Sequence, residues 1–147
     1  NLRWSWHEPT KALFARIDAL HARHFAAEPD PAARNSAVHG LMREAEIARA
    51  APLLDYLADR NDLRLIGPRD AAARAPTVAV DLGRPALPVA AALAAHDVNA
   101  GGGDFYAVRP LQAMGVDPRQ GVLRMSFVHY TTEDEVARLI AALDAVL

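Results

Sequence analysis

The 147-residue chain carries a net charge of −2, has 52% hydrophobic residues and contains no cysteine. This length and composition describe one ordinary globular protein, and the lack of cysteine excludes disulfides, thiolate metal sites and thiol catalysis. The near-neutral charge argues against a nucleic-acid or membrane-surface partner. No apolar run is long enough to span a bilayer and nothing resembles a signal peptide, which favours a cytoplasmic location.

The first part of the chain has helical periodicity. Apolar residues recur at helical spacing over residues 10–27, and again from about residue 35 to residue 60. Pro52 lies inside the second pattern, where it removes a backbone donor and predicts a kink or a fresh start. His21 and His24 are three residues apart on the first predicted helix, but no further ligand has a suitable spacing. We therefore predict no metal site there.

Strand-like patterns begin at residue 63. Apolar alternation predicts strands over residues 63–66 and 77–82, with a loop over residues 70–74 between them. Pro88 suits the first turn of a helix, which should run to residue 96, and Asp97 can adopt the left-handed turn after it. The remaining predictions are a strand over residues 98–100, another strand near Phe105 and Tyr106, and a short helix over residues 110–114.

The last quarter of the chain has the clearest pattern. Residues 122–128 alternate with period two, so that one face is apolar and the other carries Arg124 and Ser126. A helix follows, because Thr132 and Glu135 have the spacing of a capping box. Its apolar stripe consists of Val136, Leu139, Ile140, Leu143 and Val146.

This order of elements predicts an α+β fold. Three or four short strands would form a small, mostly antiparallel sheet, and the helices would pack mainly on one face of it. The division expected from the sequence is an N-terminal helical segment over residues 1–35 and a small domain over residues 36–147.

Two motifs in the last quarter carry a family resemblance. Residues 122–139 resemble the C-terminal signature of class V aminotransferases, which include cysteine desulfurase-like and isopenicillin-epimerase-like proteins. The family pattern is Arg-x-Ser followed by Tyr-Asn-Thr and Glu-Val, and Thr131 stands here where asparagine is usual. Residues 103–107, Gly-Asp-Phe-Tyr-Ala, match the family motif Gly-x-x-(Cys or Tyr)-Ala. The resemblance covers about residues 41–147 and includes the Arg-Ala-Pro-Thr run at residues 74–77.

The resemblance implies the small C-terminal domain of a fold type I, pyridoxal-phosphate-dependent enzyme. The cofactor would be bound by a large domain that this chain lacks, and residues 1–35 would link to it. The family acts on amino acids and forms homodimers. Thr10 is the single residue here that resembles the family's Gly-Thr, which reaches the cofactor phosphate of a partner subunit.

The resemblance also assigns roles to residues of the last quarter. Arg124 would bind the α-carboxylate of the substrate, for which a planar fork of donors is suited. Asp104 and Tyr106 would lie on the loop that covers the substrate. Tyr106 stands where desulfurases carry their persulfide-forming cysteine, so ordinary desulfurase chemistry is not expected. Judged from the residues alone, solvent exposure is the favoured interpretation for Arg124. Packing of Phe105 and Tyr106 under the loop is an equal alternative to a role at the site.

No catalytic residue is predicted within this chain. Lys11 is its only lysine, and the sequence around Lys11 does not resemble the family's Schiff-base motif. The glycines at residues 101–103 lack the spacing of a phosphate-binding loop and predict a flexible loop near the site. The chain alone is expected to be inactive.

Two alternatives stay open. One is a stand-alone α+β module that binds or oligomerises without catalysis. The other is a small-molecule sensor of ferredoxin-like shape, whose ligand pocket would be closed within this domain.

Overall fold

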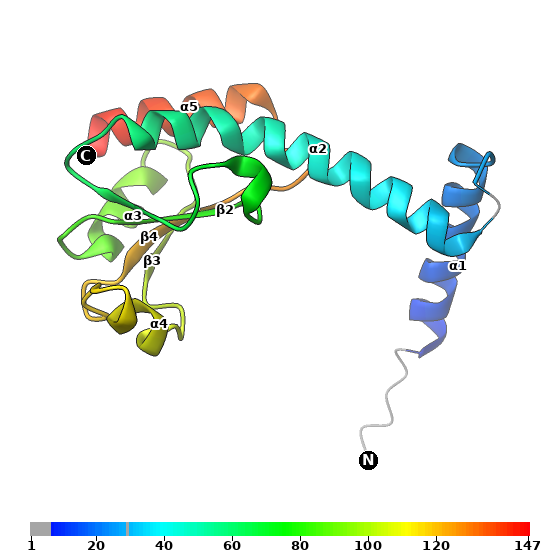
Figure 1. Cartoon of the computed structure of the whole chain (residues 1–147), viewed down its shortest axis with the longest axis horizontal. Helices are drawn as coiled ribbons and strands as arrows, with labels where there is room; N and C mark the ends of the chain where they lie inside the picture. The colour runs from blue at the N-terminus through cyan, green and yellow to red at the C-terminus, as the bar shows by residue number, and fades with distance from the viewer. Residues whose placement is uncertain (1–6, 29) are drawn as a thin grey trace, which may run out of the picture. The chain divides into compact units, whose positions relative to one another are not determined.

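The computed structural model describes residues 7–28 and 30–147 (Figure 1). The chain divides into two compact units, one ending at Arg43 and the other running from Glu44 to Leu147. Among the described residues, no helix combines the length and the apolar character that crossing a membrane requires.

Two helices form the N-terminal part of the chain. Helix α1 spans His7–His24 and helix α2 spans Pro31–Ala58. Helix α2 begins four residues before the predicted start because Asp30 caps it, its carboxylate accepting the backbone N–H of Ala33 at 3.1 Å. Pro31 suits the first helical position, where a missing N–H leaves no hydrogen bond unmade.

Helix α2 continues through Pro52 without a break, so no fresh start occurs at this proline. Pro52 is exposed, whereas the next two residues, Leu53 and Leu54, are buried. The buried side chains hold the helix in place although Pro52 has no N–H to donate to the carbonyl of Ala48. Packing therefore outweighs the local preference for a break.

The predicted antiparallel sheet is confirmed. It contains four strands in the order β1-β2-β4-β3, and every neighbouring pair is antiparallel. The central strand β4 pairs Arg124 with Ala79 of β2 on one side and with Gly101 of β3 on the other. The strands are β1 Arg64–Ile66, β2 Thr77–Asp81, β3 Gly101–Gly103 and β4 Val122–Ser126.

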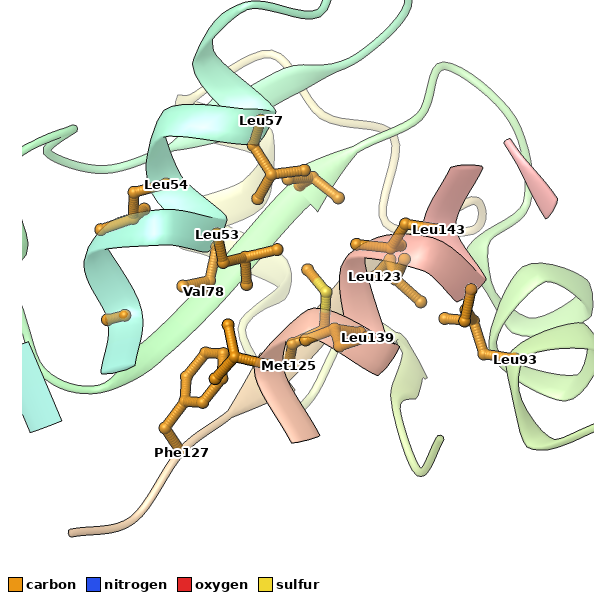
Figure 2. Packing of buried hydrophobic residues seen from close by; sticks show 14 of the residues in the cluster. Leu53, Leu54, Leu57, Val78, Leu93, Leu123, Met125, Phe127, Leu139 and Leu143 are labelled. Carbon is orange, nitrogen blue, oxygen red and sulfur yellow. The ribbon is translucent and has the colours of Figure 1, made fainter. Parts of the chain in front are cut away.

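The main core lies on one face of this sheet, as predicted. It joins α2 and the sheet to α3 (Ala86–Ala94) and α5 (Glu133–Val146). Figure 2 shows side chains from all of these elements converging. The largest fully buried side chains, each with less than 2% exposure, are Leu53, Leu54, Leu57, Leu93, Leu123, Leu143, Val78 and Val80.

Helices α2 and α5 lie side by side on this face (Figure 1). Near one end, Arg49 donates to the Glu133 carboxylate at 2.6 Å. Near the other end, the Tyr56 hydroxyl donates to Asp144 at 2.7 Å. From the first of these contacts to the second, the residue numbers increase in both helices, so α2 and α5 run in the same direction. Burial and the hydrogen bond to Asp144 raise the pKa of Tyr56 above its usual value.

Arg74 holds the connection between β1 and β2. Its guanidinium donates to the backbone carbonyls of Ile66, Pro68 and Thr77 at 3.2, 2.7 and 2.9 Å. Burial lowers its pKa. Within the segment predicted as a loop, residues 71–73 form one 3-10 turn, and the Asp70 carboxylate caps it.

The segment around the three glycines departs from the predictions. Residues 101–103 form strand β3 rather than a flexible loop, and the strands predicted over residues 98–100 and near Phe105 are absent there. The glycines permit close approach: a Cβ on Gly102 would lie 2.6 Å from the backbone of Leu87, and one on Gly121 would lie 2.4 Å from that of Gly103.

A second, smaller cluster lies on the opposite face of the sheet. It contains the buried residues Leu111, Val116 and Val122, with Phe105 packed against them. Leu111 belongs to the short helix α4 (Val108–Ala113). This cluster begins at Val122, and farther along β4 the same face carries the exposed residues Arg124 and Ser126. The uncovered part of the sheet therefore carries Arg124, one of the predicted site residues.

Candidate functional site

Strand β4 presents Arg124 and Ser126 on the face turned away from the main core. Both residues are exposed, whereas Leu123 and Met125, which alternate with them along the strand, are buried. The Ser126 hydroxyl lies 3.3 Å from the hydroxyl of Thr77 on β2. Period-two alternation thus places the guanidinium on the outer face, as the sequence predicted.

The side chain of Arg124 stacks on an aromatic ring. Its Cζ atom lies 3.8 Å from the centre of the Phe105 ring. Within residues 7–28 and 30–147, Arg124 has this contact and no ion pair with a carboxylate. The hydrogen-bond donors of the guanidinium are therefore not used by the described residues, and Phe105 supports the group from one side.

Phe105 sits in a tight turn of unusual backbone geometry. Phe105 and Tyr106 have φ angles of 50° and 60°, which side-chain-bearing residues rarely adopt. The Asp104 carboxylate accepts the N–H of Tyr106 at 3.0 Å, and the Asp104 carbonyl accepts the N–H of Ala107 at 2.8 Å. Positive φ at both central residues is the geometry of a type I′ turn. Strained turns of this kind cluster at functional sites.

The two aromatic residues of the turn point to different environments. Phe105 is half-buried against the small cluster, whereas Tyr106 is fully exposed, at 103%. The sequence-based alternative in which both rings pack under the loop is therefore wrong for Tyr106. Successive residues at the centre of a tight turn point in different directions, so only one ring reaches the sheet.

Three of the four predicted site residues belong to one region. Asp104 and Tyr106 flank Phe105 in the turn, and Phe105 contacts Arg124. The Asp104 carboxylate, however, is engaged with the backbone of the turn. Thr10 lies in α1, within the unit that ends at Arg43, and its side chain is outside the part of the structure described.

Phe105 is the member of the site that sequence reasoning missed as a functional residue. The sequence indicates only a packing role for Phe105, because nothing in the spacing of Phe105 and Arg124 indicates contact. The signal in the sequence is the run of three glycines. In the structure, a Cβ on Gly101 would lie 2.8 Å from the Phe105 ring. A strand that must leave room for a neighbouring ring requires glycine there.

The groups considered for binding pyridoxal phosphate are Lys11 and the three glycines at residues 101–103. Lys11 is exposed on α1, in the unit that ends at Arg43, whereas Arg124 belongs to the unit that starts at Glu44. The three glycines pair with β4 as a strand and do not cradle a phosphate. No group of three or more His, Asp or Glu suited to a metal ion is found in the described part of the chain.

Solved structures of cysteine desulfurases share this fold. The crystal structure of the cysteine desulfurase CsdA from Escherichia coli matches with 28% identity and a TM-score of 0.55, over 69% of this chain and 25% of that one. The predicted family resemblance is confirmed. The cysteine desulfurase of Thermococcus onnurineus NA1 matches with 22% identity and a TM-score of 0.65, over 78% of this chain and 29% of that one.

The desulfurase-like fold is also shared by a NifS-like protein from Rickettsia africae. The identity is 15% and the TM-score 0.57, over 71% of this chain and 29% of that protein. The chain thus spans between a quarter and a third of the length of these cysteine desulfurase-like structures. No family model and no curated protein sequence matches the chain.

Proposed function

We propose that this chain is the small C-terminal domain of a pyridoxal-phosphate-dependent, class V aminotransferase-like enzyme, and that Arg124 binds the α-carboxylate of an amino-acid substrate. One observation supports this role most strongly. Arg124 is exposed on β4 and stacks on Phe105, and no described carboxylate pairs with it. The fold shared with cysteine desulfurases supports an enzyme as the parent protein.

The chemistry of the guanidinium suits a carboxylate. Two parallel N–H groups can donate to the two oxygens, which fixes the position and the orientation of the acid. Hydrogen bonds to charged groups contribute about 1.5–3 kcal/mol each. Because a bound carboxylate orients the rest of the amino acid, Arg124 would act by positioning the substrate rather than by transferring protons.

The cofactor would belong to a larger domain of the parent. Pyridoxal phosphate stabilises a carbanion next to the amino group of its substrate. The contribution of this chain is to hold the acid group with Arg124 and to present Tyr106 and Asp104 at the turn beside it. A cysteine-free chain cannot carry a persulfide at this turn, so the parent would act on an amino acid without being an ordinary desulfurase. A cytoplasmic homodimer is the assembly that we propose.

Kinetics of the longer polypeptide that carries this chain test the proposal. Arg124→Leu should raise the KM for the amino-acid substrate about 10- to 100-fold, because a charge-assisted pair is lost. Arg119→Leu is the matched control, since Arg119 is an exposed arginine that already pairs with Asp117 at 2.9 Å. It should leave the KM unchanged. An unchanged KM in Arg124→Leu would refute the carboxylate-binding role of Arg124.

A second experiment tests the inactivity of this chain by itself. Pyridoxal phosphate is added to the 147-residue protein and the mixture is reduced with borohydride. Mass spectrometry should find no more adduct on Lys11 than on the same chain after heat unfolding. A specific Lys11 adduct together with turnover of an amino acid would contradict the proposed division between the two domains.

A further inference from the structure

We propose that Phe105 is the positioning residue of the Arg124 site. Its ring holds the guanidinium in one plane, so that a carboxylate is bound only from the edge of that plane. The part that concerns carboxylate binding rests on the proposed function, whereas the part that concerns the guanidinium does not. Neither the family motif nor the spacing of the two residues assigns this role to Phe105.

The short separation determines the orientation of the guanidinium. Cζ lies 3.8 Å from the ring centre. If the guanidinium stood upright on the ring, one of its nitrogens, about 1.3 Å from Cζ, would lie about 2.5 Å from the ring centre. That is well inside the contact distance of about 3.5 Å. The short separation therefore favours a nearly flat stack of the two planes, with the N–H groups directed outward at the edge.

The ring itself is held on several sides. The left-handed backbone of Phe105 is fixed by the hydrogen bonds of Asp104 to Tyr106 and Ala107. The side chain packs against the cluster of Leu111, Val116 and Val122. On the remaining side, Gly101 leaves the space that the ring occupies. A ring held in this way is a rigid support, which lowers the entropy that Arg124 loses when a ligand binds.

The stacked geometry selects how a ligand approaches. One face of the guanidinium is covered by the ring, so a planar acid must enter within the plane of the fork. In this arrangement both carboxylate oxygens meet parallel N–H groups, which is the bidentate geometry. The ring also keeps water from one face of the cation, and this strengthens its electrostatic attraction for the acid.

Nuclear magnetic resonance of the 147-residue chain tests the proposal. In the wild type, the Arg124 Nε–Hε group should be rigid on the nanosecond timescale and its proton shifted upfield by the ring. Phe105→Leu should abolish the upfield shift and make the group as mobile as that of a solvated arginine. Phe105→Tyr keeps a ring and should retain both signatures. Unchanged amide shifts of Leu54 and Leu143, which are buried in the main core, show that each variant is folded.

Titration with acetate tests the consequence for binding. Acetate should perturb Arg124 in the wild type and in Phe105→Tyr, and should bind about two- to five-fold more weakly in Phe105→Leu. Arg60 is an internal control, because it lies over Tyr56 at 5.6 Å but already donates to Asp62. It should not respond to acetate.

The outcomes separate this proposal from the proposed function. If Phe105→Leu leaves the mobility of Arg124 and its acetate affinity unchanged, the positioning role of Phe105 is refuted. If Arg124 depends on Phe105 for its rigidity but does not bind acetate in any variant, the guanidinium part stands and carboxylate binding is refuted. In the longer enzyme, Phe105→Leu should raise the KM with little change in kcat, and Phe105→Tyr should restore it.

Discussion

Gly101 lies directly opposite Arg124 in the ladder between β3 and β4. A Cβ added to Gly101 would lie 2.8 Å from the Cζ atom of the Phe105 ring, the ring on which Arg124 stacks. The glycine, the ring and the guanidinium thus form one packed unit in which each depends on the next. A methyl group at the glycine would act on Arg124 through the ring.

Substitution of Gly101 by alanine should disturb this unit. The ring must shift to avoid the methyl group, so the upfield shift of the Arg124 Hε proton should decrease, and the free energy of unfolding should fall by about 1 kcal/mol. Chemical shifts and amide exchange in β4 measure both effects. Gly40→Ala is the control for the Arg124 shift, because nothing lies within 4 Å of its added Cβ. A Gly101→Ala variant with wild-type Arg124 shifts would contradict the geometry.

Gly102→Ala should be more harmful than Gly101→Ala. The added Cβ would lie 2.6 Å from backbone atoms of Ala86 and Leu87, at the start of α3. Backbone atoms cannot rotate away as a side chain does, so β3 or α3 must move. We expect the free energy of unfolding to fall by about 2–3 kcal/mol. Urea unfolding of both variants measures the order. Equal stability of the two variants would contradict this order and would show that α3 can shift at little cost.

Pro52→Ala should stabilise the protein. Pro52 lies inside a continuous helix and is exposed, so little packing is lost when its ring is removed. Alanine restores an N–H for the Ala48 carbonyl and has a higher helix propensity than proline. The free energy of unfolding should therefore rise by about 1–3 kcal/mol. Asp55→Ala, an exposed position one turn on, is the comparison. Amide exchange of Leu53 and Leu54 reports the local change, and faster exchange in Pro52→Ala would contradict it.

Tyr56→Phe removes the hydroxyl that donates to Asp144 at 2.7 Å. The same hydroxyl also accepts from Arg60 at 2.7 Å, so two hydrogen bonds are lost. The expected loss of stability is about 1–2 kcal/mol, since one hydrogen bond typically contributes about 1 kcal/mol. The raised pKa of Tyr56 also predicts an alkaline effect. Because the folded state holds this proton more tightly than the unfolded chain, the stabilisation is present below pH 10 and is lost as pH rises through the folded pKa. Tyr56→Phe should flatten that alkaline decline, as measured by urea unfolding across the pH range.

The capping box of α5 predicts an effect at acid pH. The Thr132 N–H donates to the Glu135 carboxylate at 2.8 Å, and bonds from the backbone and hydroxyl of Thr132 lower the Glu135 pKa below its usual 4.5. The stabilisation by the Glu135 carboxylate is therefore present above pH 4.5. It is lost as pH falls through the lower pKa of Glu135 in the folded state. Glu135→Gln should remove this pH dependence. Exchange of the first α5 amides between pH 7 and pH 3 measures it, and an equal acid response in the variant would contradict the assignment.

The elements with strong local signals could be predicted from the sequence. Strand β4 and helix α5 were predicted from period-two alternation and from the capping pair Thr132 and Glu135, and both are present. The left-handed turn at Asp97 is also present, with φ of 57°. In each case the deciding interactions lie within a few residues of one another, so the local sequence contains them.

Strand β3 could not be predicted because glycine has no side chain and therefore no hydrophobic pattern. Residues 101–103 become a strand through pairing with β4 and through close approach to α3 and Phe105. Helix α2 likewise continues through Pro52 because of burial contacts that no local preference reveals. Both departures arise from packing between distant parts of the chain.

The sequence by itself determined the α+β class, the outward face of Arg124 and its match to the family motif, since alternation and motif spacing are local properties. Only the tertiary structure decided that the Phe105 ring supports the guanidinium while Tyr106 faces solvent. The physical reason is that a contact between a turn and a strand depends on sheet register and on the space left by Gly101. Neither is specified by the residues near Arg124 in the chain.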